Sequence, residues 1–207
     1  MINKDTIVYG SFSTNPGNNG ILFFNKKFKE LNINAIYKSF YSNNIEESYN
    51  AAKILNFGGF AVSMPYKKDI LKYVDILSDE VIKIGSANTI KFFDKFSIAY
   101  NTDYIGIIKY FENFNYSKIN ILGDGGFSSA AKYAFNKMNI QYDIIKRKNW
   151  INIKLLKNEI IFNCTPIKNI IYDNSCQFID GISTTETGKQ IAKYQAEEQL
   201  KIYLKKK

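Results

Sequence analysis

Histidine is absent from the 207-residue chain, and this absence excludes several kinds of catalytic site. Without an imidazole the protein has no Ser-His-Asp or Cys-His nucleophile, no histidine metal ligand and no histidine general base. Acid–base chemistry must therefore come from lysine, carboxylate, tyrosine or cysteine side chains.

Cysteine and long apolar segments are also scarce. The two cysteines, Cys164 and Cys176, lack the CxxC spacing, so the sequence predicts neither a zinc site nor a disulfide framework. No run approaches the roughly 18 apolar residues that a membrane-spanning helix needs, and polar residues appear as early as Asn3. We expect a soluble, cytoplasmic protein without a membrane partner.

Arginine is nearly absent, although the net charge is +9. Lysine and arginine together number 28, of which only Arg147 is an arginine, so 27 are lysines. A nucleic-acid interface would favour clustered arginines with interleaved aromatic residues, whereas this lysine-rich composition is typical of genome bias. We therefore expect no nucleic-acid partner, and a basic structural or RNA-associated protein has only the charge in its favour.

Short β-rich runs alternate with amphipathic helical segments, and this pattern predicts an α/β protein. The polar segment 11–20 is expected to be a loop. The expected strands are 6–10, 35–40, 59–63, a hairpin of 89–92 with 96–100, 119–122, 142–145, 159–163 and 178–182. The expected helices are 21–31, 45–56, 68–73, 79–84, 105–114, 128–138 and 187–206.

A glycine turn follows the strand predicted at 119–122. In a dinucleotide fold the first glycine makes the tight turn, the second admits a pyrophosphate, and a small third residue lets the helix pack closely. An ordinary tight turn between a strand and a helix is the alternative interpretation. The candidate cofactor residues of this turn are Gly123, Gly125, Gly126, Phe127 and Ser128.

The end of the next predicted strand carries Lys146, Arg147 and Lys148. An NAD site has a carboxylate at this place for the ribose 2′-hydroxyl, whereas an NADP site has a basic residue for the 2′-phosphate. Asp143 comes too early in the strand to serve as that carboxylate. The position of the only arginine favours NADP, and a solvated basic turn is the alternative.

Four ordered motifs make the chain resemble the shikimate dehydrogenase family. The segments 62–67, 84–90 and 100–106 and the glycine turn are similar to the family's NVTxPxK, IGAxNT, NTDxxG and GxGGxxxA patterns. The opening residues 1–6 and the variant 61–65 resemble the shikimate dehydrogenase-like subgroup in particular.

The resemblance implies an N-terminal α/β substrate domain, a reduced Rossmann-type NADP-binding domain and a closing helix that returns to the first domain. The corresponding boundaries are 1–104 plus 187–207 for the substrate domain and 105–186 for the cofactor domain. The implied activity is reversible, NADP-dependent reduction of 3-dehydroshikimate to shikimate, a step of aromatic amino acid biosynthesis, in a cleft between the domains. We expect a monomer or a homodimer.

The resemblance also assigns roles to individual residues. The family's catalytic lysine and aspartate fall on Lys67 and Asp103. Reduction of a ring ketone needs a proton donor at the developing alkoxide, and a lysine ammonium held by a carboxylate can serve in a chain without histidine. Taken alone, Lys67 would be a solvated lysine and Asp103 a helix N-cap.

Substrate contacts are implied for five further residues. Asn88 matches the family's ligand of a substrate hydroxyl, Ser63 replaces its threonine, and Gln195 resembles the glutamine of its closing helix. The serine pair that holds the substrate carboxylate falls on Ser13 when counted from the strand and on Asn18 when counted from the helix. The register of this loop stays open, as does the choice among shikimate, quinate and an amino analogue.

The cofactor half departs from the family pattern. Thr165 follows the strand end much as the family's threonine does, but Asp124 puts a negative charge into the glycine turn. The 64 residues from Ile119 to Ile182 are too few for a complete six-stranded dinucleotide domain. The alternative function is therefore a weakened or inactive relative that binds a small carboxylate or a nucleotide.

Overall fold

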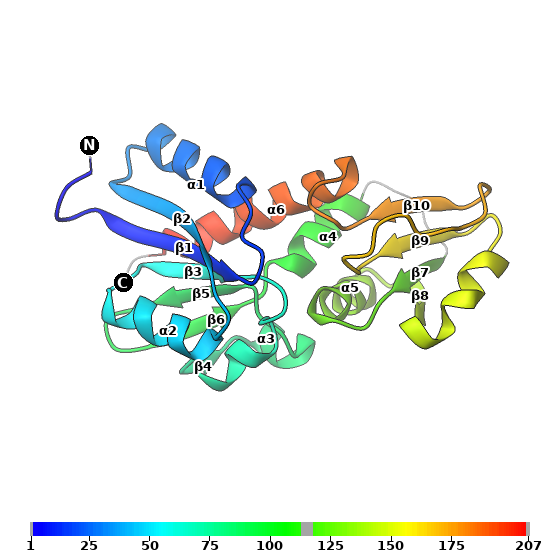
Figure 1. The fold of residues 1–207 in the computed structure, drawn as a ribbon, viewed down its shortest axis with the longest axis horizontal. Coiled ribbons are helices and arrows are strands. Elements are labelled where there is room, and N and C mark those ends of the chain that lie inside the picture. Colours follow the sequence, from blue (N-terminus) through cyan, green and yellow to red (C-terminus); the bar gives the residue numbers. More distant parts are fainter. Residues whose placement is uncertain (1, 113–117, 206–207) are drawn as a thin grey trace. The chain divides into compact units, whose positions relative to one another are not determined.

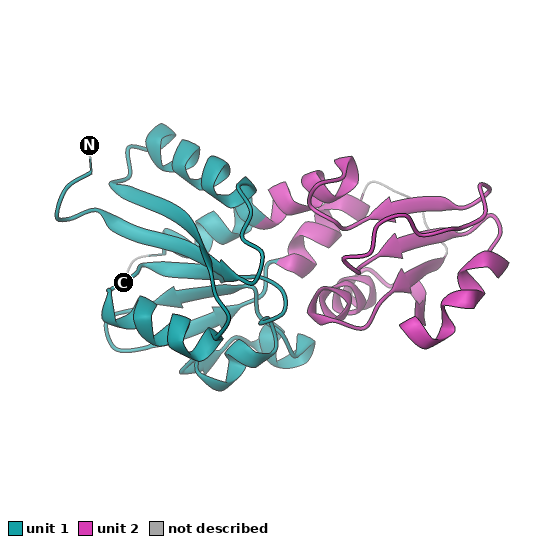
Figure 2. Ribbon diagram, viewed as in Figure 1, with its two compact units in different colours: residues 1–102, 196–207 teal, residues 103–195 magenta. Residues whose placement is uncertain are grey.

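The chain forms two compact units in a computed structural model that describes residues 2–112 and 118–205. Unit 1 comprises Met1–Thr102 and Ala196–Lys207, and unit 2 comprises Asp103–Gln195 (Figure 2). The last residues of the helix expected at 105–114 lie outside the described residues. Each unit has its own sheet and its own core.

The sheet of unit 1 has six strands in the order β2-β1-β3-β5-β6-β4 (Figure 1). β1, β2 and β3 are parallel, β5 is antiparallel to β3 and to β6, and β4 is parallel to β6. The carboxyl ends of β1, β3 and β6 and the amino end of β5 therefore share one edge of the sheet. The strands are β1 Ile7–Ser13, β2 Ala35–Tyr41, β3 Gly59–Val62, β4 Ile76–Leu77, β5 Thr89–Phe92 and β6 Ser97–Tyr100.

Helices cover both faces of this sheet, with α1 and α2 on opposite sides (Figure 1). Local sequence fixes their ends: the Asn44 side chain accepts hydrogen bonds from the first amides of α2, and the Ser78 side chain accepts one from the first turn of α3. Gly85 ends α3 in the left-handed conformation, at φ 71°. The helical elements are α1 Asn19–Glu30, α2 Ile45–Ile54, the 3-10 turn η1 Asp69–Lys72 and α3 Asp79–Ile84.

The carboxyl end of helix α6 (Glu186–Tyr203) completes the core on the α1 side of the unit 1 sheet. The ring of Tyr203 is buried 4.6 Å from that of Tyr9 and 5.5 Å from that of Phe24. The Tyr203 carbonyl accepts hydrogen bonds of 3.0 Å from the Tyr9 hydroxyl and from Nζ of the buried Lys91. These contacts anchor the last turn of α6 in unit 1.

Unit 2 contains four parallel strands in the order β10-β9-β7-β8. Aromatic residues of α4, α5 and β9 pack together on one face, where the ring of Phe111 lies 5.0 Å from Phe135 and 5.2 Å from Phe162. The elements are α4 Asp103–Phe111, β7 Lys118–Leu122, α5 Gly126–Lys137, β8 Gln141–Ile145, the 3-10 segment η2 Arg147–Leu155, β9 Ile160–Asn163 and β10 Gln177–Asp180.

The α/β class is confirmed, and the expected elements differ from the structure mainly at three places. The loop expected at 11–20 is wrong at both ends, because β1 continues to Ser13 and α1 begins at Asn19. Cross-strand pairing overrides the polar composition there, since the Ser11 hydroxyl lies 3.0 Å from that of Ser39. Neither β4 nor η2 was expected; β4 is two residues long and exists through its pairing with β6.

Candidate functional site

Lys67 and Ser63 lie just beyond β3, at the shared edge of the unit 1 sheet. The Ser63 amide donates to the Phe12 carbonyl at 3.1 Å, and the Lys67 carbonyl accepts a 2.7 Å hydrogen bond from the Ala87 amide. Lys67 is half-buried and Ser63 is exposed. The backbone of the predicted catalytic lysine is thus tied to the segment that leads into Asn88.

The Asn88 side chain is held by several hydrogen bonds at the amino end of β5. Its Oδ1 accepts from the Thr102 amide at 2.8 Å and from the Thr89 hydroxyl at 2.9 Å. Its Nδ2 donates to the Thr102 hydroxyl at 2.9 Å. Because Asn88 is 7% exposed, these bonds fix the plane of a buried amide at the sheet edge.

A second amide joins the same two segments. The Asn101 side chain donates to the Ser86 carbonyl at 2.9 Å, and both residues are buried. Asp103, two residues after Asn101, is buried and begins α4. Asp103 is counted with unit 2, so its predicted pairing with Lys67 stays a prediction.

Gln199 of α6 is a polar residue that the sequence analysis missed. Its Nε2 donates to the Thr89 hydroxyl at 2.7 Å and to the Asn88 carbonyl at 3.3 Å, and the residue is 6% exposed. Its position next to Leu200 and four residues before Tyr203, on the buried side of the helix, could have indicated burial.

The predicted Gln195 belongs to unit 2. Its Cγ would lie 2.5 Å from a Cβ built on Gly106, so α6 approaches the backbone of α4 closely there. The glycine of the NTDxxG motif therefore has a packing role in this chain. The predicted substrate contact of Gln195 stays a prediction.

The two candidates for carboxylate recognition differ in burial. Ser13 is the last residue of β1, is buried, and its carbonyl accepts a 2.9 Å hydrogen bond from the Ser42 amide. Asn18 is exposed at the amino end of α1, and its side chain makes no capping hydrogen bond. The roles of both residues stay predictions.

The glycine turn of unit 2 joins β7 to α5. Gly123 has φ +105°, and a Cβ at this residue would lie 2.8 Å from the Thr165 methyl group, so the position needs glycine. Gly125 is the N-cap of α5, and a Cβ there would meet no atom within 4 Å. The buried Ser128 donates to the Gly123 carbonyl at 2.9 Å, which closes the turn.

This turn fits a phosphate group. The amino end of the 12-residue α5 has no acidic side chain in its first turn, and the backbone of Gly125 is open to an approaching group. Thr165 is fixed beside the turn, because its amide and hydroxyl donate to Asn163 Oδ1 at 3.0 and 2.7 Å. Phe127 packs against Gly181, where a Cβ would come within 2.5 Å of its ring.

Charged side chains surround the turn. The Lys146 ammonium lies 2.6 Å from Asp124 Oδ2, and the Lys132 ammonium lies 3.5 Å from Oδ1. The hydrogen bond from Lys146 and the charges of both lysines lower the pKa of the Asp124 carboxyl. Arg147 and Lys148 are exposed at the start of η2.

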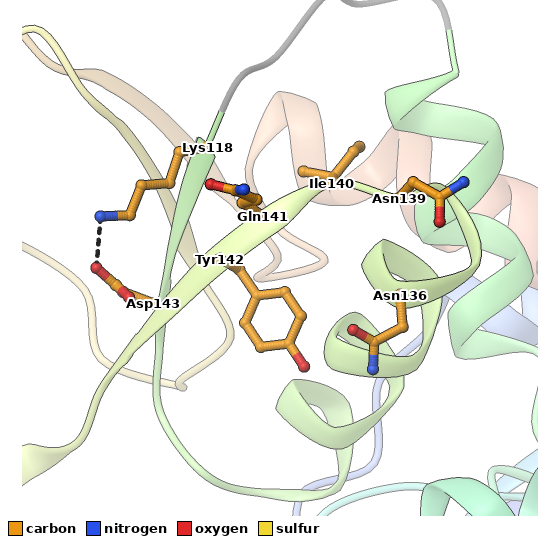
Figure 3. Close-up of a pocket in the computed structure, with 7 residues that line it drawn as sticks. All are labelled: Lys118, Asn136, Asn139, Ile140, Gln141, Tyr142 and Asp143. Carbon is orange, nitrogen blue, oxygen red and sulfur yellow. Dashed lines mark ion pairs between the residues drawn. The ribbon is translucent and has the colours of Figure 1, made fainter.

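A cavity of about 620 Å³ lies at the amino ends of β7 and β8, opposite to the glycine turn (Figure 3). Its lining is mostly polar and includes an ion pair of 2.6 Å between Lys118 and Asp143. None of the residues that line this cavity was among the predicted site residues. Within residues 2–112 and 118–205, no cluster of three potential metal ligands and no helix able to cross a membrane is found.

Relatives of known family match this chain over much of its length. Residues 19–90 match the family described as the shikimate dehydrogenase substrate binding domain. A shikimate dehydrogenase-like protein of Haemophilus influenzae is 37% identical over 144 residues, which are 68% of this chain and 53% of that protein. A shikimate dehydrogenase (NADP(+)) of Pyrococcus furiosus is 35% identical over 144 residues, 67% of this chain and 53% of that protein.

The aligned region thus spans about half the length of these two curated relatives. The fold agrees with the sequence match: the crystal structure of shikimate dehydrogenase 1 from Peptoclostridium difficile superposes with a TM-score of 0.82 at 26% identity, covering 97% of this chain and 92% of that one. The resemblance predicted from four short motifs is confirmed: the chain is similar to shikimate dehydrogenases in sequence and in fold.

Proposed function

We propose that the protein catalyses the reversible, NADP-dependent reduction of 3-dehydroshikimate to shikimate. The observation that carries the proposal is the edge of the unit 1 sheet, where the Asn88 amide is fixed by Thr102 and Thr89 and the Lys67 backbone is fixed by Ala87. Such an edge offers oriented polar groups for a hydroxylated ring and a lysine for proton transfer.

The substrate chemistry belongs to unit 1 in this proposal. Lys67 donates a proton to the ring oxygen as negative charge develops on it, and Asp103 keeps the ammonium charged and oriented. Asn88 and Ser63 hydrogen bond to ring hydroxyls. Because the Asn88 amide is already held in place, little side-chain entropy is lost when substrate binds.

The cofactor chemistry belongs to unit 2. When bound, NADPH supplies the hydride that reduces the ring ketone. The backbone of Gly125 and Gly126 holds the pyrophosphate, and Lys146, Arg147 and Lys148 recognise the 2′-phosphate. Thr165 stays beside the turn through its bonds to Asn163.

A spectrophotometric assay tests the function directly. The full chain is incubated with shikimate and NADP, and with quinate or NAD in place of either compound, while reduction of the nicotinamide is followed. We expect turnover with shikimate and NADP, and faster turnover than with quinate or NAD. Failure of shikimate to support any reduction, in a protein that calorimetry shows to bind both compounds, would contradict the proposal.

A binding protein without turnover is the second candidate function. Two observations favour it. First, Lys146 is engaged in an ion pair with Asp124. Second, the sheet of unit 2 has four strands, and the connection from β9 to β10, residues 164–176, is described throughout and contains no helix. This candidate predicts that shikimate or a nucleotide binds while reduction stays at the rate of the Lys67→Ala variant. The assay above and its calorimetric control separate the two functions.

A further inference from the structure

The carboxylate of Asp124 is engaged by two lysines of unit 2. Oδ2 lies 2.6 Å from the ammonium of Lys146, at the end of β8, and Oδ1 lies 3.5 Å from that of Lys132, in α5. Lys146 is one of the three basic residues expected to recognise a 2′-phosphate. The structure thus shows an acidic partner on this lysine.

Sheet register brings the acid and the base together. β7 and β8 are parallel, with Leu122 opposite Ile145, so the residues that follow these two positions emerge at the same edge. A phosphate monoester carries a charge of about −1.5 to −2 at neutral pH. It competes with Asp124 for the Lys146 ammonium, and it is repelled by the Asp124 carboxylate.

We propose that Asp124 is a specificity-determining residue that weakens the preference of this chain for 2′-phosphorylated nucleotides. The inference rests on the proposed NADP function and concerns the affinity of the same site. Asp124 acts by pairing with Lys146 and by placing a negative charge beside the glycine turn. A nucleotide without a 2′-phosphate does not depend on Lys146 for binding. The Asp124 carboxylate therefore lowers the affinity for such a nucleotide less.

A purely structural role for Asp124 makes a different prediction. The ion pairs of Asp124 join the turn to α5 and to the end of β8. If their role is structural, removing them would destabilise the conformation of the whole turn. Binding of both kinds of nucleotide would then weaken together. The comparison of two nucleotides that differ only in the 2′-phosphate separates the two roles.

The chain offers a matched control at the other end of the same two strands. Lys118 and Asp143 form an ion pair of 2.6 Å, equal in length to that of Lys146 and Asp124 (Figure 3). The side chains are similarly exposed, at 44% and 61% in the control pair and 50% and 42% in the pair at the turn. Asp143→Asn therefore changes the net charge as Asp124→Asn does, away from the glycine turn.

The experiment is a calorimetric titration of the full chain with adenosine 2′,5′-bisphosphate and with adenosine 5′-monophosphate. We expect Asp124→Asn to raise the affinity for the bisphosphate by about threefold to tenfold and that for the monophosphate by less than about twofold. Asp143→Asn should leave both affinities within about twofold. In the Lys146→Gln background the gain from Asp124→Asn should shrink, because the released ammonium is missing.

The outcomes distinguish this inference from the proposed function. An unchanged or weaker bisphosphate affinity in Asp124→Asn, or an equal gain for both nucleotides, overturns the role of Asp124 while the NADP proposal stands. A gain of the same size in Asp143→Asn also overturns it, since the effect would then be one of net charge. Binding of neither nucleotide by any of the proteins overturns both the inference and the proposed cofactor.

Discussion

The two units build the carboxyl edges of their sheets by different means. The edge in unit 1 contains a network of buried neutral groups, in which hydrogen bonds of 2.8 to 3.3 Å join Asn88 to Thr102 and to Gln199. In unit 2 the edge consists of glycine backbone and exposed charges, where Asp124 pairs with Lys146. The polar groups at the first edge are held by hydrogen bonds within the protein, whereas the ion pair at the second edge is exposed to solvent and to screening by salt.

This difference determines how each edge responds to change. The hydrogen bonds of a buried amide are little affected by salt. Removing one side chain of such a network leaves its partners without a hydrogen bond. An exposed ion pair contributes little to folding and is screened by salt. We therefore expect substitutions at the unit 1 edge to affect turnover and folding, and charge substitutions at the unit 2 edge to affect nucleotide affinity in a salt-dependent manner.

The largest expected effect concerns Lys67. Lys67→Ala should lower kcat by roughly 10² to 10⁴-fold with a much smaller change in substrate affinity, because its contact strengthens as charge develops on the ring oxygen. Asp103→Asn should also lower kcat, and the two losses should not add. The measurement is a double-mutant cycle on kcat/KM.

Lys68→Ala serves as the control, since this neighbouring lysine is exposed. Circular dichroism checks that each variant is folded. Additive losses, or unchanged turnover in Lys67→Ala, would show that the lysine takes no part in proton transfer and would favour the binding protein.

Gly106 tests the close backbone approach within unit 2. A Cβ at this residue would lie 2.8 Å from the Ile191 carbonyl and 2.5 Å from Gln195 Cγ. The carbonyl is part of α6 and cannot turn aside, so Gly106→Ala should cost about 1–3 kcal/mol in the free energy of unfolding. Urea denaturation measures the change.

Gly17→Ala is the matched control, because a Cβ there meets nothing within 4 Å. Its effect should stay within about 0.5 kcal/mol. Equal stability of the two variants would mean that α4 and α6 are less closely packed than the structure indicates.

Gln199 tests the buried network of unit 1. Gln199→Leu removes the donor to the Thr89 hydroxyl and to the Asn88 carbonyl, and we expect a loss of about 1–2 kcal/mol in stability. The Asn88 amide should also be less well oriented, so KM for shikimate should rise more than kcat falls. Steady-state kinetics and urea denaturation together measure both effects.

The control for Gln199 lies in the same helix. Gln190 is exposed and donates only a 3.3 Å hydrogen bond to Tyr194, so Gln190→Leu should change stability by less than about 0.5 kcal/mol. A Gln199→Leu enzyme with unchanged KM would limit the role of this residue to folding.

Arg147 tests the charged edge of unit 2. Arg147→Ala should lower the affinity for NADP by about tenfold and leave NAD little affected, because the guanidinium forms charge-assisted hydrogen bonds to the 2′-phosphate. The exposed Lys154 of η2 provides the control, Lys154→Ala. Fluorescence titration at low and high salt measures the affinities, and equal losses for both cofactors would remove Arg147 from the site.

Periodicity and turn residues predicted most of the fold. The helix expected at 79–84 has the bounds of α3, since Ser78 and Gly85 are strong local end markers. The two-residue β4 could not be predicted, because it exists only through pairing with β6. The extension of β1 through Ser13 also depends on neighbouring strands, and its polar residues gave the opposite indication.

The site could be predicted only in part, for a similar reason. Motifs identified Asn88 and the glycine turn, because their residue types are restricted by backbone geometry and hydrogen bonding. The ion pair of Asp124 with Lys146 depends on strand register, and Gln199 depends on which side of α6 is buried. Helical spacing could indicate that Gln199 is buried, but the hydrogen-bond and ion-pair partners of these residues are set by tertiary contacts, which leave no local pattern in the sequence.

The anchoring of Tyr203 has a consequence for biosynthesis. Tyr9 and Tyr203 are joined by a hydrogen bond across a separation of 194 residues, and the whole of unit 2 is translated between the two segments of unit 1. Contacts of such long range form late, and the apolar surface that they bury stays exposed until then. On the ribosome, the core of unit 1 is therefore completed only after unit 2 has been translated. Until α6 emerges, its residues cannot cover the rings of Phe24 and Phe28.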